Sequence, residues 1–361
     1  MKRDSTFVST WGIKRSYDDF IVDEVLYPAL SGGRDTPAST RITLSKSGLT
    51  TLESARLIAL AAAVDLGDID WAGLKDEDGV TRQTLSVRGV YTAEQVSAWS
   101  EKLAVSLPTG THARLTFAGY ADAPLTPGAL LGNAFSVVVR NLAPSHLPLI
   151  GQLTRRPFAF INYYDLQRFG RKDEQKLNHL IGAALIEGDR EFAASLYARK
   201  VRRGEVSGID EPSASLDRLA PQEEILIRNA HESHAWNRLA MSACESSMGT
   251  LDKETFEHGL AFGYFDDEQA EASGLVTRTL AIRRHRLRDR VPSTSESTRQ
   301  IIDTTLIRCL EEKVDAQTGT ASVALSFFLP SGSYATTVIR QLEHRVLTTA
   351  GQLTAQAEAA Q

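Results

Sequence analysis

The chain has 361 residues, of which 42% are hydrophobic and 24% charged, a composition typical of a folded globular protein rather than a disordered or fibrous one. This length exceeds what one hydrophobic core usually serves, so we expect two closely associated domains. No apolar run is long enough to span a membrane and no signal-peptide pattern follows Met1, which predicts a cytoplasmic protein. Cys244 and Cys309 lie in segments with helical apolar spacing and are expected to be buried free thiols, and the scattered His residues predict no zinc site.

The net charge of −5 argues against a protein that simply coats nucleic acid, but the basic residues are unevenly distributed. They gather in residues 155–156, 168–176, 199–203 and 278–290. The last segment carries six Arg against a single Asp, as expected of a surface that tracks phosphates. The alternative is a solvated helix face balanced by acidic neighbours, yet four such segments in the middle of one chain favour a basic face.

The first part of the chain predicts strands alternating with helices. Alternating apolar residues predict a half-buried strand over 40–45. Thr50 and Glu53 form a Thr-x-x-Glu capping box, which begins a helix that ends near residue 65. Short strands are expected over 69–72 and 83–87, so the connection between them is an exposed turn.

Further along, the pattern predicts a helix over 92–104 and strands over 113–118 and 135–140. The connections are too short for repeated crossover helices, which favours a mixed, largely antiparallel sheet. After a Pro-containing junction the pattern becomes helical over 173–186, 189–203 and 222–247. A strand over 322–329 and a final helix follow. The expected fold class is α/β (α+β), with a mainly helical domain inserted into a sheet domain.

Asp76 is the most informative residue, because it lies in a Gly-x-Lys-Asp turn between the two short strands. A carboxylate displayed in this way can act as a nucleophile or a base, although Asp76 on its own could be an ordinary turn residue. The surrounding motif reads Ala72-Gly73-x-Lys75-Asp76-x-x-x-x-Thr81-x-Gln83. This spacing resembles the catalytic motif of the TruD family of tRNA pseudouridine synthases, and the resemblance implies that Asp76 is the catalytic carboxylate.

Three further stretches resemble the same family. The first, Lys14-Arg-Ser-Tyr-Asp-Asp-Phe20-Ile-Val-x-Glu24, looks like the family's Lys-x4-Asp-Phe opening. The others are Gly128-x-Leu130-x-Gly132-Asn133-x-Phe135-x4-Arg140 and Asn162-Tyr-Tyr-Asp-Leu-Gln167-Arg168-Phe169-Gly170. The resemblance implies that Lys14 reaches the active site, that Asn133 and Phe135 line the pocket for the target base, and that the third stretch opens the insertion domain. Residues 233–237 and 329–336 add weaker support.

The resemblance also implies a domain organisation and a reaction. Residues 1–152 and 305–361 are expected to form a pseudouridine synthase catalytic domain, and residues 153–304 a TRUD-type insertion domain. The implied reaction isomerises uridine to pseudouridine, with uridine 13 of a tRNA as the expected target. It requires no metal, nucleotide or redox cofactor. RNA, and tRNA in particular, is the expected partner of a monomer that needs no other protein.

Each supporting residue has a plainer alternative. Lys14 can keep the carboxylate of Asp76 ionised or be an exposed lysine beside Arg15. Asn133 can bond the edge of a uracil or hold a turn at Gly132. Phe135 can stack on an extruded uracil or pack in the core.

The expected RNA contacts are Lys75, Arg168, Arg283, Arg284 and Arg286. Lys75 could instead steady the catalytic turn. A competing class of protein is a binding protein, such as an RNA-folding chaperone, that uses the same scaffold without catalysis. Hydrolytic glycosidase action is disfavoured because it requires a second placed carboxylate. Residues 249–300 lack the motifs expected in the second half of the insertion domain, so the sequence supports the chemistry better than the RNA target.

Overall fold

The computed structural model describes residues 9–28, 37–170, 175–201, 216, 219, 221–266, 269, 279–288 and 291–359. The chain forms two compact units. The sheet unit consists of Thr10–Pro157 and Thr305–Gly332, and the mixed unit of Met1–Ser9, Phe158–Thr304 and Ser333–Gln361. Within the described ranges, no helix combines the length and apolar character required to cross a membrane.

The sheet unit contains eight strands in the order β13-β14-β6-β1-β4-β2-β5, with β3 paired to β4. The strands are β1 (Phe20–Leu26), β2 (Ser39–Ser47), β3 (Ile69–Trp71), β4 (Val80–Arg88), β5 (His112–Ala121), β6 (Leu130–Leu142), β13 (Arg308–Val314) and β14 (Ala321–Pro330). Neighbours β1 and β4 run parallel, and the other pairs run antiparallel. This arrangement confirms the predicted α+β class with a mixed, largely antiparallel sheet.

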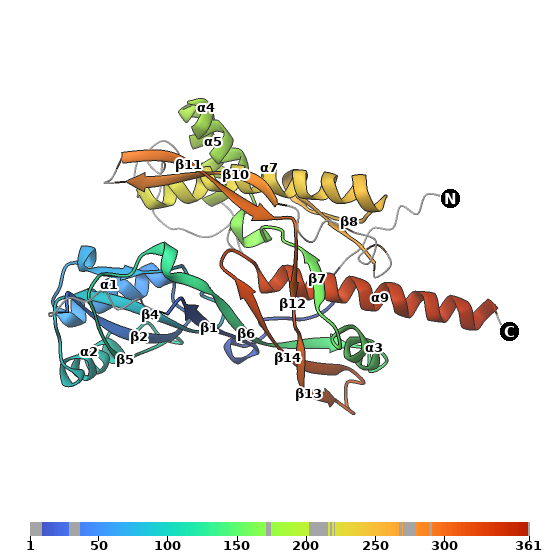
Figure 1. Ribbon diagram of the computed structural model, residues 1–361, viewed down its shortest axis with the longest axis horizontal. Coiled ribbons are helices and arrows are strands. Elements are labelled where there is room, and N and C mark those ends of the chain that lie inside the picture. The colour runs from blue at the N-terminus through green and yellow to red at the C-terminus, as the bar shows by residue number, and fades with distance from the viewer. Residues whose placement is uncertain are drawn as a thin grey trace. The chain divides into compact units, whose positions relative to one another are not determined.

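Helices α1 (Thr51–Ala62) and α2 (Ala93–Val105) pack side by side against β2, β4 and β5 (Figure 1). Both begin at capping boxes, the first at the predicted Thr50 and the second at Thr92, and the side chains of Thr50 and Thr92 accept hydrogen bonds from backbone N–H groups three residues later. Ile58 of α1 and Trp99 of α2 share one apolar core with Leu85 of β4. The sheet unit also contains α3 (His146–Leu153).

The strand register gathers the motif residues on the same face of the sheet. Val22 on β1 lies opposite Phe135 on β6 and Thr81 on β4, and Thr81 lies opposite Lys46 on β2. Because successive side chains of a strand point to opposite faces, Lys46 shares the face of Leu44, which packs under the helices. Sequence segments that are far apart in the chain therefore meet on this face.

The mixed unit combines helices with short strands. Its elements are β7 (Phe158–Ile161), α4 (Asn178–Glu187), α5 (Arg190–Val201), α7 (Pro221–Met248), β8 (Asp252–Thr255), β9 (Ala261–Tyr264), β10 (Thr279–Arg288), β11 (Val291–Gln300), β12 (Ile302–Thr305) and α9 (Ala335–Ala359). Tyr163, Trp236 and Phe262 lie in its core. The β10–β11 hairpin packs along α7, and α4 packs against α5 and α7 (Figure 1).

One alternative and one expectation from the sequence differ from the structure. The described part of the basic segment 278–290 is a strand, β10, that pairs with β11, so the alternative of a solvated helix face is wrong. Such pairing depends on a partner strand, which helical periodicity cannot reveal. Cys309 is exposed and lies on a strand, because β13 is at the edge of the sheet; Cys244 is buried, and both cysteines are free thiols.

The two compact units divide the chain near the predicted junctions, after Pro157 and after Thr304. The segment Ser333–Gln361, which includes α9, belongs to the mixed unit. The assignment of residues 1–152 and 305–361 to a catalytic domain and of 153–304 to an insertion is a statement about function and stays a prediction.

Gly132 on β6 should be intolerant of any side chain. A Cβ atom there would lie 2.2 Å from the backbone oxygen of Leu329 and 2.4 Å from Cζ of Phe328. We expect Gly132→Ala to lower the free energy of unfolding by roughly 1–3 kcal/mol through overpacking, measured by urea denaturation. Gly151→Ala is the matched control, because a Cβ there meets nothing within 4 Å and alanine favours the helix by up to about 1 kcal/mol. Equal effects of the two substitutions would contradict this packing.

Candidate active site

Asp76 lies in the turn between β3 and β4 and forms an ion pair with Lys14. The Nζ atom of Lys14 is 2.7 Å from Oδ2 of Asp76, and the two side chains are 15% and 27% exposed. Lys14 Nζ also lies 4.2 Å from the centroid of the Phe20 ring. The expected pair therefore forms, and it leaves the carboxylate partly accessible. The catalytic role of Asp76 stays a prediction.

The backbone holds Lys14 in an unusual conformation. Its φ of 56° is left-handed, which is uncommon for a residue other than glycine and is often found at functional sites. Nearby, Gly12 exchanges two backbone hydrogen bonds of 2.8 Å with Arg140 on β6. The Arg140 guanidinium donates to both carboxylate oxygens of Asp19 at 2.9 and 2.7 Å and so lowers the pKa of Asp19. These contacts on both sides of Lys14 fix the segment that carries it.

A second lysine, Lys46, holds the backbone of the turn. Its Nζ atom donates to the carbonyl oxygens of Asp76 at 2.8 Å and Leu49 at 2.7 Å. The residue is 1% exposed. Burial lowers the pKa of Lys46 to about 8, although the nearby negative charge of Asp76 acts in the opposite direction. Lys46 therefore positions the main chain of Asp76 rather than its carboxylate.

Lys75 is buried in an ion pair with Glu24 of β1. The two charged atoms are 2.7 Å apart, and the side chains are 3% and 1% exposed. Glu24 also accepts a hydrogen bond of 2.9 Å from the backbone N–H of Thr84. This burial favours the turn-steadying role of Lys75 over the alternative of a contact with RNA phosphate.

Thr51 and Gln83 connect the two ends of the turn. The backbone N–H of Lys75 donates to Oγ1 of Thr51 at 2.9 Å, and that hydroxyl donates to Oε1 of Gln83 at 2.9 Å. The amide of Gln83 donates to the backbone oxygen of Gly73 at 3.3 Å. Gln83 of the motif and Thr51 at the start of α1 therefore shape the turn.

Asn133 and Phe135 lie on β6, beside the strand that carries Glu24. Phe135 is 6% exposed. The centroid of its ring lies 5.9 Å from that of Phe20 and 5.5 Å from that of Phe327. Oδ1 of Asn133 is buried and accepts no hydrogen bond from the part of the chain that the structure describes. An unsatisfied buried acceptor typically costs about 1–3 kcal/mol, which calls for a functional explanation.

Sequence reasoning assigned no role to Lys46, Thr51, Gln83 or Glu24. For Lys46 a signal was available, because it continues the buried alternation of Ile42 and Leu44 on β2. A lysine on the buried side of a strand requires polar partners in the interior, which points to a site with a specific architecture.

The arginines expected to contact RNA all lie in the mixed unit. Arg168 ends the short 3-10 turn η4 (Leu166–Arg168), and Arg283, Arg284 and Arg286 lie on β10. Arg283 and Arg286 are exposed, whereas Arg168 and Arg284 are half-buried. As for metals, the described residues contain no group of three or more His, Cys, Asp or Glu side chains placed to hold an ion.

Comparison with known proteins identifies the family. The family model described as tRNA pseudouridine synthase D (TruD) matches residues 9–252, about two thirds of the chain, including the Asp76 turn and the segment of Asn133 and Phe135. The chain therefore belongs to the TruD family. The match ends before β10.

Individual relatives agree. A protein from Pyrococcus furiosus named "Probable tRNA pseudouridine synthase D" is 32% identical over 185 residues, covering 51% of this chain and 41% of the relative. One of the same name from Pyrococcus abyssi is 29% identical over 239 residues, covering 63% and 54%. The "tRNA pseudouridine synthase D" of Geobacter sulfurreducens is 28% identical, covering 65% and 60%. The chain thus aligns with about half the length of these relatives.

The fold has a counterpart among solved structures. The crystal structure of a protein assigned as tRNA pseudouridine synthase D from Methanosarcina mazei matches with a TM-score of 0.55 and 18% identity, covering 91% of this chain and 92% of that one. At this identity the match supports the fold alone.

The buried ammonium of Lys46 predicts a pH dependence of stability. Its pKa is about 8 in the folded protein, against 10.5 for an ordinary lysine, so between these values the unfolded chain binds more protons than the folded protein. Stability due to Lys46 should therefore rise with pH across this window. At about 1.4 kcal/mol per pH unit, the unfolding free energy of the wild type should gain roughly 3 kcal/mol relative to Lys46→Met.

The measurement is urea denaturation of both proteins at several pH values from 7 to above 10. The variant serves as the reference that cancels the titration of all other groups. If the free energies of unfolding of the two proteins differ by the same amount at every pH between 8 and 10.5, Lys46 has an ordinary pKa.

Proposed function

We propose that this protein is an RNA pseudouridine synthase that isomerises uridine in tRNA, with Asp76 as the catalytic carboxylate. The observation that carries the proposal is the geometry at Asp76: a partly exposed carboxylate, held by Lys14 and by a rigid turn, at the catalytic motif position of a TruD family member. Its neighbours Lys75 and Lys46 are buried and fix the turn, so Asp76 is the reactive group that this turn presents.

The reaction breaks the bond between C1′ of the ribose and N1 of the uracil, turns the base, and joins C1′ to C5; C5 then loses its proton to solvent and N1 gains one, so the product is an isomer of uridine. Asp76 either attacks C1′ or removes the proton from C2′ to give a glycal. Both routes require an ionised carboxylate, and the ammonium of Lys14 lies 2.7 Å from it. Asp76 therefore performs the first step, and Lys14 acts as its charge partner.

The uracil must be held while it is detached. The free Oδ1 of Asn133 is an acceptor suited to the N3–H of uracil, and Phe135 forms the apolar wall beside it. Flipping the target uridine from its stack costs a few kcal/mol, which these contacts would offset. Cytosine lacks the N3–H donor, so Asn133 would also select the base.

The expected substrate is tRNA, since the relatives are named tRNA pseudouridine synthase D. The TruD resemblance makes uridine 13 the first position to examine. The competing possibility, an RNA-folding chaperone without catalysis, leaves the accessible Lys14–Asp76 pair without a purpose.

The proposal is tested by the release of tritium from 5-tritiated uridine in unmodified bulk tRNA. Wild-type protein should release tritium, and Asp76→Asn should release none at matched RNA occupancy, because the amide cannot act as nucleophile or base. Mapping of pseudouridine in the product should locate the modification at position 13.

Lys14→Met is the companion variant, and it should slow release without abolishing RNA binding. Binding of tRNA by the wild type without any release would favour the chaperone function. Undiminished release by Asp76→Asn would exclude Asp76 as the catalytic group.

The variant Asn133→Leu should lose activity without losing stability. The substitution removes a buried acceptor that has no partner within the described chain, so the free energy of unfolding should stay unchanged or rise by about 1 kcal/mol. Loss of the bond to uracil should lower kcat/KM by about tenfold or more. Kinetics of tritium release and urea denaturation measure the two effects.

Val137→Ala on the same strand is the control. Val137 is 1% exposed, and its truncation should lower stability while leaving kcat/KM within about threefold. A large loss of stability in Asn133→Leu would instead assign Asn133 a structural role.

A further inference from the structure

Three arginines surround the ring of Tyr164 in the mixed unit. Their guanidinium carbons lie 4.0 Å (Arg299), 5.5 Å (Arg284) and 6.0 Å (Arg168) from the ring centroid. Arg168 and Arg284 come from separate basic segments of the sequence, and the fold brings them to the same aromatic side chain. Like charges repel, so this arrangement requires compensation.

Arg299 is buried and directs its hydrogen bonds to groups inside the protein. It is 7% exposed and donates to the backbone oxygen of Asn162 at 3.0 and 2.7 Å and to its Oδ1 at 2.6 Å. It also lies 4.9 Å from the Trp236 ring. Burial lowers the pKa of Arg299.

Arg168 and Arg284 are half-buried, and each lies beside a serine hydroxyl. Nε of Arg168 donates to Oγ of Ser233 at 3.3 Å, and Nε of Arg284 lies 3.5 Å from Oγ of Ser297. Within the described residues neither guanidinium forms an ion pair with a carboxylate. Asp165 lies near Tyr334, as do Arg168 and Arg299, and it also lies near Arg340. The two guanidinium groups thus keep donors and positive charge for an external anion.

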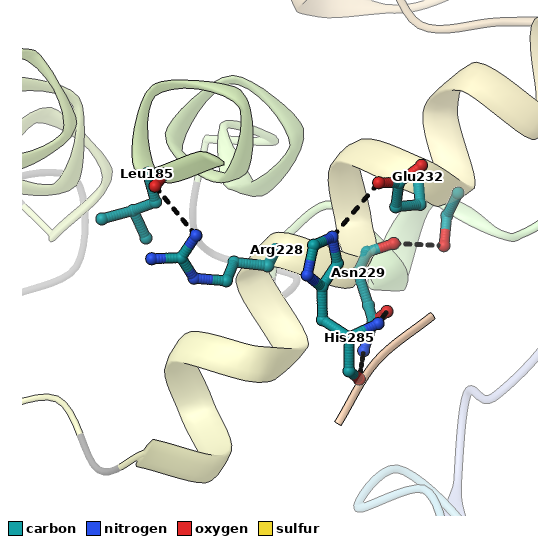
Figure 2. Close-up of polar contacts among 6 residues, drawn as sticks. Leu185, Arg228, Asn229, Glu232 and His285 are labelled. Carbon is teal, nitrogen blue, oxygen red and sulfur yellow. Dashed lines mark hydrogen bonds and ion pairs between the residues drawn. The ribbon is translucent and has the colours of Figure 1, made fainter. Parts of the chain in front are cut away.

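The position of Arg284 is set by its neighbour on β10. Figure 2 shows the side chain of Asn229 on α7 bonded to the backbone of His285: Oδ1 accepts from the N–H and Nδ2 donates to the carbonyl, both at 2.8 Å. The His285 ring lies 3.1 Å from Oε1 of Glu232. Arg228, one residue before Asn229, donates to the carbonyl oxygen of Leu185 at 2.8 Å and so joins α7 to α4 (Figure 2). These bonds fix β10 directly beside Arg284.

The other arginines of β10 differ. Arg283 is exposed and lies opposite Glu296 of β11, whereas Arg284 lies opposite Ser295. A cross-strand carboxylate compensates Arg283 in part. Adjacent residues on a strand point to opposite faces, so Arg283 does not share the surroundings of Arg284.

We propose that Arg168 and Arg284 together bind one phosphodiester group of the RNA. The proposal rests on the proposed function, which supplies RNA as the ligand. Paired guanidinium groups match the geometry of phosphate oxygens and form strong charge-assisted hydrogen bonds with them. The phosphate offsets the repulsion among the arginines around Tyr164. Of the arginines expected to contact RNA, Arg168 and Arg284 therefore form one phosphate site, and Arg283 lies outside it.

The test is the dissociation constant for unmodified bulk tRNA as a function of salt, measured on the full chain. Arg168→Gln and Arg284→Gln should each weaken binding about tenfold and reduce the salt slope by roughly one. Because both residues hold the same phosphate, the double variant should bind about as weakly as either single variant. Arg283→Gln is the matched control from the same strand and should weaken binding less than threefold.

Two results would overturn the proposal. Losses that multiply to about a hundredfold in the double variant would assign the arginines to independent phosphates. Unchanged dissociation constants would leave Arg168 and Arg284 with a structural role on Tyr164. If the Gln variants unfold, Arg168→Lys and Arg284→Lys keep the charge, and they should retain the salt slope while losing part of the affinity; full affinity in the Lys variants would contradict paired guanidinium recognition.

Tritium release separates this proposal from the proposed function. A wild type that binds tRNA with the predicted arginine dependence but releases no tritium would refute only the catalysis. A wild type that releases tritium while the Gln variants bind as tightly as it does would refute only the phosphate site. A wild type that binds no tRNA would refute both.

Discussion

The buried ion pair between Lys75 and Glu24 is the constraint on which the candidate active site depends. Taking two charges out of water is costly, and removal of one partner would leave the other charge buried and unpaired. The pair therefore commits Lys75 to the interior. Because consecutive side chains on extended backbone point apart, a Lys75 that points inward directs Asp76 outward, towards Lys14. A buried ion pair thus determines where the carboxylate of Asp76, the proposed catalytic group, points.

The three lysines around the turn serve three different purposes. Lys14 pairs with the carboxylate of Asp76, Lys75 pairs with Glu24, and Lys46 binds main-chain carbonyl oxygens. Lys14 contacts the carboxylate of Asp76 with its side chain, whereas the described bonds of Lys46 reach its backbone, so replacement of each lysine should have a different effect. Lys46 and Lys75 act through the shape of the turn, and their loss would misplace Asp76 by a small movement, which is sufficient to cost a large factor in rate.

Local patterns predicted the parts of this fold that local physics controls. The capping boxes at Thr50 and Thr92 began helices where expected, and the family motif singled out Asp76. Register could not be read from alternation, because it depends on which strands pair; hence the row that joins Phe135, Val22, Thr81 and Lys46 became visible only in the structure. For the same reason the β10–β11 hairpin was missed, since β10 carries few apolar residues and its identity as a strand depends on β11 and on Asn229.

The mixed unit contains residues inside the family match and residues beyond it. Tyr164 and Arg168 lie inside the part of the chain that matches the family model, whereas Arg284 lies beyond residue 252, where that match ends. A phosphate site formed by Arg168 and Arg284 therefore combines a residue within the family match with one outside it. The turn that carries Asp76 belongs to the sheet unit, whereas β10 belongs to the mixed unit. If the proposed phosphate site is correct, residues of β10 contribute to RNA binding from a different unit than the one that carries Asp76.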